Sequence, residues 1–155
     1  MTYQLEIKPL QGAVTTEELL QVAHLMFSES RFANLGVAED KLFLHVHDIL
    51  TNPQWLAFGA FEKGVLCGMV IGLCGAVLPF SSAVVATEHY LYLRQEYRGG
   101  KESWALVKAF IAGAKHRGAK DVIFSNGYGG DPTKVERLFE KCGLIRIGSI
   151  FTLGD

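Results

Sequence analysis

The chain has 155 residues, of which 49% are apolar and 20% charged, and its formal net charge is −1. This size and composition are typical of one globular domain with a substantial core, here residues 1–155, and they exclude a disordered chain. The near-neutral balance gives no bulk attraction to nucleic acid or to an anionic membrane, so we predict neither as a partner.

The N-terminal third predicts one strand and two helices. Residues 3–10 ("YQLEIKPL") alternate with period two, as a strand does. Residues 15–30 predict a helix whose start is marked by Thr15 and Glu18 in capping-box spacing, and residues 38–52 predict a second helix. His45 and His47 lie two apart in that helix and would point about 200° away from each other, so we predict no metal site there.

Three consecutive strands are predicted next, over residues 55–61, 65–78 and 82–93, with a tight turn at Gly64 between the first two. The second of these runs is apolar but shorter than the roughly 20 residues that a membrane helix needs, which favours a buried strand. The chain has three cysteines and no Cys-x-x-Cys pattern, which favours a reducing compartment. We therefore expect a cytoplasmic protein.

The last third alternates helices and strands. A helix over residues 104–118 is followed by a strand over residues 120–126 and by a second helix, which Asp131 and Pro132 begin and Gly143 ends. Residues 144–153 ("LIRIGSIFTL") predict a final strand. The element order βααβββαβαβ indicates an α/β (α+β) fold with a mixed sheet.

The stretch "LRQEYRGGKES", residues 93–103, joins the third of the consecutive strands to a helix. The first N–H groups of a helix have no intrahelical partner, and the helix dipole makes that end positive, so such a junction can bind phosphate. Gly99 and Gly100 let the backbone amides turn inward, and Arg98 and Lys101 add positive charge. A simple basic turn has a similar sequence, and neither the P-loop nor the dinucleotide glycine pattern is present.

The element order, and "EYRGG" leading into an amphipathic helix, resemble the GNAT superfamily of acetyl-CoA-dependent N-acetyltransferases. The resemblance covers residues 84–153, including "VERLFEKCGLIRIGS", and "SESRF" is similar to the substrate-side helices of phage-type members. In that family a loop of pattern [Gln/Arg]-x-x-Gly-x-[Gly/Ala] binds the coenzyme A pyrophosphate. Here Lys101 and Ser103 stand at the fourth and sixth positions, and Phe139 replaces a tyrosine that is often the general acid.

The resemblance implies a mixed, mostly antiparallel sheet of about 6–7 strands with about four helices. It also implies that the fourth and fifth strands are parallel and splay apart, with acetyl-CoA bound between them. The residues expected to contact this cofactor are Tyr92, Leu93, Arg98, Gly99, Gly100, Lys101, Glu102 and Ser103.

Glu88 is the expected catalytic base, because family members often use a carboxylate in the fourth strand and Glu88 is the one carboxylate in residues 82–93. Burial would raise its pKa, whereas an ion pair or an edge position would make it structural. By strand alternation, Tyr90 shares the face of Glu88 and His89 points to the other face. Tyr128 in "NGYGG" is the expected general acid, with a plain loop tyrosine or protonation by water as alternatives.

The sequence thus predicts an enzyme that moves an acetyl group from acetyl-CoA to a primary amine, on a small molecule or a protein, by direct attack in a ternary complex. One alternative is a catalytically degenerate member that binds acetyl-CoA or a partner without turnover. Another is a nucleic-acid module using Arg94, Arg98 and Lys101, which the acidic balance disfavours. A homodimer is left open.

Overall fold

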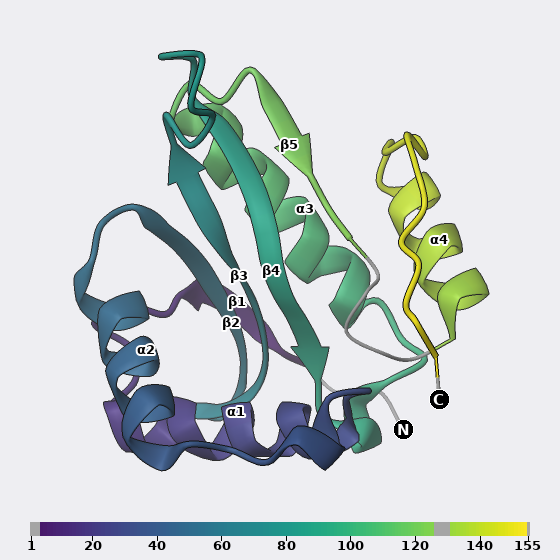
Figure 1. Ribbon diagram of the computed structural model, residues 1–155. Helices are drawn as coiled ribbons and strands as arrows, with labels where there is room; N and C mark the ends of the chain where they lie inside the picture. Colours follow the sequence, from purple (N-terminus) through teal and green to yellow (C-terminus); the bar gives the residue numbers. More distant parts are fainter. Residues whose placement is uncertain (1–3, 126–130, 155) are drawn as a thin grey trace.

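The computed structural model describes residues 4–125 and 131–154, which form one five-stranded sheet and four α-helices (Figure 1). None of the helices in these ranges is long and apolar enough to cross a membrane. In chain order the elements are β1 (Glu6–Pro9), α1 (Thr16–Glu29), the 3-10 helix η1 (Ala33–Leu35), α2 (Glu39–Thr51), β2 (Trp55–Glu62), β3 (Val65–Gly75), β4 (Val85–Leu93), the 3-10 helix η2 (Gln95–Tyr97), α3 (Glu102–His116), β5 (Asp121–Ile123) and α4 (Pro132–Lys141).

The strands lie in the order β1-β2-β3-β4-β5, with antiparallel pairing up to β4 and a parallel pair at β4–β5. Lys63 and Gly64 join β2 to β3 with φ of 49° and 82°, the two positive values of a type I′ hairpin turn. This confirms the predicted tight turn. The parallel pair needs a crossover connection, which α3 supplies.

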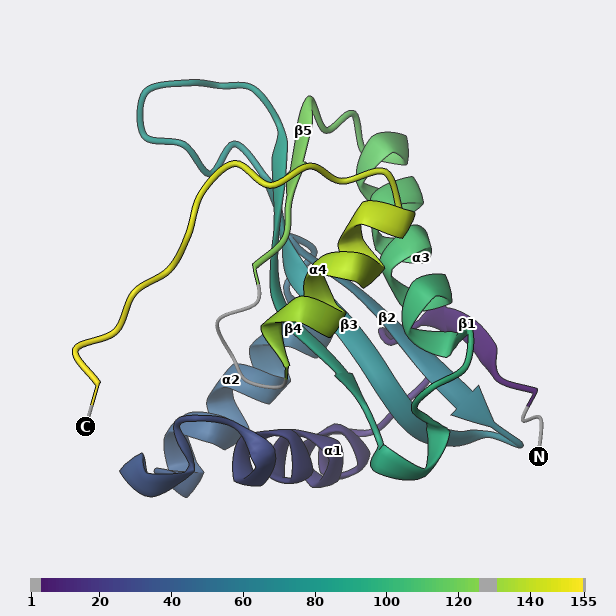
Figure 2. The ribbon, with the colours of Figure 1, turned by 90° about the vertical axis from the view of Figure 1, so that its right-hand side faces the viewer.

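Helices cover both faces of the sheet (Figures 1 and 2). On one face, α1 and α2 pack through Leu19, Val22, Val46 and Ile49 against inward-facing strand residues such as Met69 and Ile71. On the other face, α3 packs against the alternate strand residues, including Val70 and Ala86.

The predicted helix starts are confirmed. Thr15 and Glu18 form a reciprocal capping box at α1, each side chain accepting from the other residue's backbone N–H. Asp131 accepts from the Thr133 N–H at the start of α4, with Pro132 in the first turn. These signals are local, so the sequence alone specifies them.

A β-bulge interrupts β4 near its middle. Ile71 pairs with Tyr90 and the next residue, Gly72, pairs with Glu88, so His89 is the extra residue. The rings of His89 and Tyr90 then lie on the same side, 6.2 Å apart between centroids, and His89 contacts Trp55. The prediction that Tyr90 shares the face of Glu88 is therefore wrong. The bulge puts Tyr90 with His89 on the α1–α2 face, whereas Glu88 pairs with Gly72 and lies on the α3 face.

The predicted final strand is absent, because the structure assigns no strand to residues 144–153. Ile145, Ile147 and Phe151 are 83%, 80% and 89% exposed. In Figure 2 this segment leaves α4 and extends away from the rest of the chain. An alternating pattern selects an apolar face, but a strand also needs an edge to pair with, and β5 has only three residues. The described residues therefore form fewer strands than expected.

Gly72 sits at the bulge and has no room for a side chain. A Cβ there would collide with the Thr87 carbonyl oxygen and lie 2.9 Å from the Glu88 Cα. We expect Gly72→Ala to lower the free energy of unfolding by about 2 kcal/mol or more in urea denaturation. Gly75→Ala, in the same strand with nothing within 4 Å of the added Cβ, should change it by less than about 0.5 kcal/mol. Equal stability of the two variants would contradict the bulge.

Candidate functional site

The strands β4 and β5 pair over their first residues and then separate. The two strands pair at Val85–Asp121, Ala86–Val122 and Thr87–Ile123, and the described residues show no later pair, although β4 continues to Leu93. In Figure 1 the two strands lie side by side where they begin and separate along their length. This confirms the expected parallel, splayed pair. We call the point of separation, at Glu88 on β4 and residues 124–125 after β5, the fork.

Glu88 lies at the fork and is only 9% exposed. Its Oε1 accepts a hydrogen bond from the Ser125 N–H at 3.1 Å. Burial raises the pKa of Glu88 from 4.5 to about 7, against the opposing effect of that hydrogen bond. None of the described basic side chains forms an ion pair with it. A carboxyl group that is half ionised near neutral pH is suited to accept and release a proton.

A cluster of polar and aromatic rings lies on the face covered by α1 and α2, opposite the face that carries Glu88. His45 Nε2 and the Tyr90 hydroxyl are 2.8 Å apart, and the ring of Trp55 packs edge-on against His45. The Trp55 Nε1–H donates to Asp48 Oδ2 at 2.7 Å. No local pattern in the sequence predicts this cluster, because His45 and Tyr90 are 45 positions apart and only the tertiary fold joins them.

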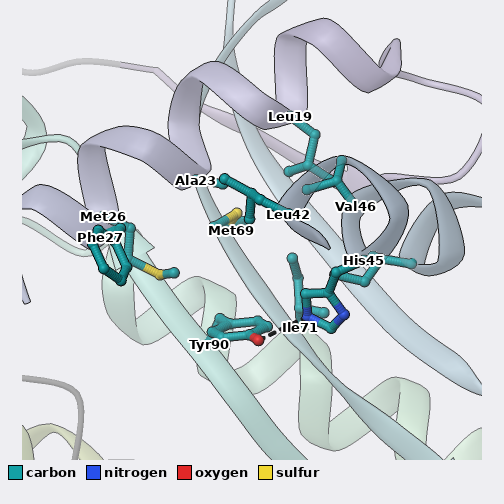
Figure 3. Close-up of a pocket in the computed structure, with 11 residues that line it drawn as sticks. Leu19, Ala23, Met26, Phe27, Leu42, His45, Val46, Met69, Ile71 and Tyr90 are labelled. Carbon is teal, nitrogen blue, oxygen red and sulfur yellow. Dashed lines mark hydrogen bonds between the residues drawn. The ribbon is translucent and has the colours of Figure 1, made fainter. Parts of the chain in front are cut away.

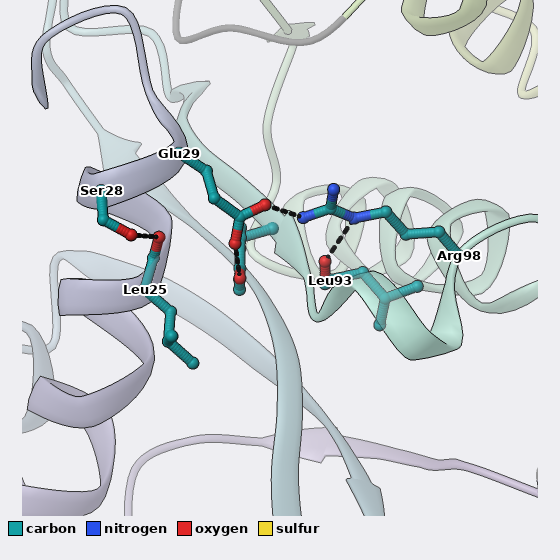
Figure 4. Close-up of polar contacts among 6 residues, drawn as sticks. Leu25, Ser28, Glu29, Leu93 and Arg98 are labelled. Carbon is teal, nitrogen blue, oxygen red and sulfur yellow. Dashed lines mark hydrogen bonds and ion pairs between the residues drawn. The ribbon is translucent and has the colours of Figure 1, made fainter.

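Arg98 is held by two partners within the chain (Figure 4). Its Nε donates to the Leu93 carbonyl and its Nη2 to Glu29 Oε1, both at 2.7 Å. Tyr92 donates its hydroxyl to the other Glu29 oxygen. Burial alone would raise the pKa of Glu29, but the hydrogen bonds from Tyr92 and Arg98 outweigh it and the pKa is lowered. Arg98 therefore ties the loop to the end of α1, a contact that sequence reasoning missed.

The loop before α3 presents backbone amides. Gly99 has a φ of 92°, a left-handed conformation that a residue with a Cβ adopts at a cost, and Lys101 precedes α3 without a side-chain cap. The first-turn N–H groups of α3 can therefore turn toward an anion. The Glu102 carboxylate lies against Gly100 and occupies the space in which a Cβ on residue 100 would lie.

Lys101 and Ser103 lie at the start of α3 beside these amides, whereas Phe139 lies in α4. Lys101 is exposed and Ser103 half-buried in the first turn of α3. Phe139 packs its ring against Phe124, 5.2 Å between centroids, so its place in α4 is structural. Tyr128 lies outside the described residues.

Solved structures share this fold over nearly the whole chain. A complex of AAC(6')-Iy with the bisubstrate analog CoA-S-monomethyl-acetylneamine matches with a TM-score of 0.77 at 12% identity, covering 98% of each chain. A ribosomal-protein-alanine N-acetyltransferase from Brucella melitensis matches with a TM-score of 0.71 at 16% identity, covering 98% of this chain and 100% of that one. A transcriptional regulator from Bacillus halodurans matches with a TM-score of 0.76, also at 16% identity, with the same coverage.

No family model matches the sequence, and a search of curated proteins finds no match either. At identities this low the structural likeness establishes the fold alone, because one fold hosts several functions. The chain therefore has the fold of the GNAT acetyltransferases, as the order of its elements predicts.

Proposed function

We propose that the chain is an acetyl-CoA-dependent N-acetyltransferase acting on a primary amine of a small molecule or a protein. The observation that carries the proposal is Glu88, a buried carboxyl group with a pKa of about 7 at the fork of two parallel strands. Perturbed carboxyl groups in such positions mark sites of proton transfer. The bisubstrate analog named for a protein of the same fold joins coenzyme A to an acetylated amine compound, which agrees with this chemistry.

The loop and the β4 edge are suited to hold the cofactor. In our proposal the backbone amides of residues 99–103 contact the pyrophosphate, and Lys101 adds an exposed positive charge. The pantetheine arm lies along the β5 side of β4 near Tyr92 and Leu93, in the way that a peptide adds to a sheet edge. Arg98 holds the loop in place through its ion pair with Glu29 at the end of α1.

The chemistry needs few protein groups. Acetyl-CoA supplies the acetyl group as an activated thioester. A nitrogen–carbon bond forms to the attacking amine and the carbon–sulfur bond breaks, while Glu88 takes the proton from the nitrogen. Tyr128 or water returns a proton to the sulfur. The three cysteines are free and buried, which suits our expectation of a reducing cytoplasm.

The competing proposal is a protein that binds acetyl-CoA or a partner without turnover. Lys101, Ser103 and Phe139 depart from the family pattern, and one structural neighbour is named as a transcriptional regulator. Calorimetric binding of acetyl-CoA, followed by an assay of free thiol release over a panel of amines, separates the two. Binding with no thiol release from any amine favours the competing proposal.

The loop assignment predicts that Gly99→Val weakens acetyl-CoA binding at least about tenfold, because a β-branched residue resists the positive φ that orients the amides. Gly12→Val is the matched control, since Gly12 has a φ of 82° and lies in open space far along the chain. It should lose stability to a similar extent and keep the affinity. A folded Gly99→Val protein with unchanged calorimetric affinity would remove the loop from the site.

The base assignment predicts that Glu88→Gln lowers kcat/KM by about 10²–10⁴ and keeps acetyl-CoA affinity. Wild-type activity should fall as the pH drops through about 7, where Glu88 becomes protonated. The activity of the variant should not show this fall. If Glu88→Gln keeps more than half of the wild-type kcat/KM, the role of Glu88 is structural and not catalytic.

Stability gives an independent check on the pKa of Glu88. Because the pKa is raised from 4.5 to about 7 in the folded state, ionisation of Glu88 destabilises the fold as the pH rises through that window. Each pKa unit corresponds to about 1.4 kcal/mol. Glu88→Gln should therefore gain stability relative to wild type between pH 5 and pH 8, by thermal unfolding, and a constant difference would argue against the raised pKa.

We also propose that the protein forms a homodimer through residues 144–153. The alternate residues Ile145, Ile147, Phe151 and Leu153 are all highly exposed, and contiguous apolar surface of this kind marks interfaces. Light scattering should give a dimer for wild type and a monomer for the Ile147→Asp, Phe151→Asp double variant. Leu35→Asp, which changes a residue that is 77% exposed elsewhere, should leave the dimer intact. A wild-type monomer at micromolar concentration contradicts the proposal.

A further inference from the structure

A pocket opens between α1, α2 and the adjoining face of β3 and β4 (Figure 3). Its volume is about 70 Å³. The residues that line it are Leu19, Ala23, Met26, Phe27, Leu42, His45, Val46, Ile49, Met69, Ile71 and Tyr90.

The lining is apolar apart from two groups that bind each other. His45 and Tyr90 share a 2.8 Å hydrogen bond, and the described lining contains no carboxylate, lysine or arginine. The nearest acid on α2, Asp48, already accepts from Trp55 Nε1. A ligand in this pocket therefore meets hydrocarbon surface and one neutral polar pair.

The acid at the end of α1 is also engaged. Glu29 holds both Tyr92 and Arg98, so its charge is already balanced within the chain. A polycationic ligand needs several free carboxylates, because each buried ammonium group must be paired. Neither Asp48 nor Glu29 is available for that purpose.

The pocket lies on the α1–α2 face of β4, two positions along the strand from the candidate base. Tyr90 is separated from Glu88 only by the bulged residue His89, and Tyr90 faces α2 while Glu88 reaches toward Ser125. A compound held on the α1–α2 side can thus reach β4 at the point where the β4–β5 groove begins. Burial lowers the pKa of His45, so the imidazole is neutral near pH 7 and does not repel an amine.

We propose that this pocket binds a small branched aliphatic group of the acceptor, so that the substrate is a monoamine with an apolar substituent and not a polycation. The inference rests on the proposed acetyltransferase function and names the substrate class for that site. A cavity of about 150 Å³ holds benzene, so about 70 Å³ matches an aliphatic branch better than a ring. His45 and Tyr90 position the polar part of the acceptor at the pocket mouth.

The first test compares amines that differ only in side chain. Leucinamide should be acetylated with a kcat/KM at least about tenfold above glycinamide, from burial of its side chain, and lysinamide should show no such gain. Ala23→Leu fills the pocket and should remove the preference, by lowering the kcat/KM for leucinamide to about that for glycinamide. Gln21→Leu adds the same side chain on the exposed face of α1 and should keep the preference.

Two results would overturn the inference: equal kcat/KM for leucinamide and glycinamide, or a preference that survives in a folded Ala23→Leu protein. If Ala23→Leu does not fold, Met26→Trp replaces it, because Met26 lines the same pocket and is only partly buried. A tenfold preference that Met26→Trp removes supports the inference, and one that it leaves intact overturns it.

A binding measurement separates failure of the pocket from failure of the proposed function. Calorimetry of wild type, with and without coenzyme A, should show leucinamide binding at least about tenfold tighter than glycinamide, and Ala23→Leu should abolish the difference. If no amine is acetylated but this difference is found, the acetyltransferase proposal fails and the pocket stands. If the two amines bind equally, the pocket assignment is wrong whatever the turnover.

Discussion

Among the described residues the parallel pairing of β4 with β5 is limited to three residue pairs, and the geometry around Glu88 depends on that limit. The bulge at His89 adds local twist to β4 at the same level, which turns the rest of the strand away from β5. Gly72 allows this, because the Thr87 carbonyl and the Phe110 ring from α3 occupy the space of a side chain. One missing Cβ thus lets the bulge, the crossover helix and the fork coexist.

The fork also explains the burial and the raised pKa of Glu88. The carboxyl group is buried directly after the last residue pair of the two strands, and the N–H of Ser125, two residues past the end of β5, donates to it. Burial raises the pKa and the hydrogen bond lowers it, so the value near 7 is a balance between two consequences of one geometry. The Ser125–Glu88 hydrogen bond also links β4 to the segment after β5, so the stability of the fork and the pKa of Glu88 depend on the same contact.

Local sequence signals predicted most of the fold, and non-local contacts account for what they missed. The capping box at Thr15 and the hairpin at Gly64 are encoded within a few residues. The bulge, the Arg98–Glu29 pair and the His45–Tyr90 contact join distant segments, so no local pattern carries them. The strand expected at residues 144–153 has the right alternation, but pairing depends on a partner edge that the pattern does not describe.

The charges of the loop before α3 do not act as the sequence suggests. Arg98 is balanced by Glu29, which leaves the exposed Lys101 as the other positive charge beside the backbone amides. Under the proposed function, attraction of a phosphate would come from Lys101 and from the aligned amides at the start of α3, whose field is short-ranged and fixed by the backbone. Under that proposal the site would select a ligand mainly by the geometry of its phosphates, because salt screens the charge of an exposed lysine beyond about 10 Å. In the proposed site the left-handed turn at Gly99, which orients these amides, would therefore be needed for recognition in addition to the charge of Lys101.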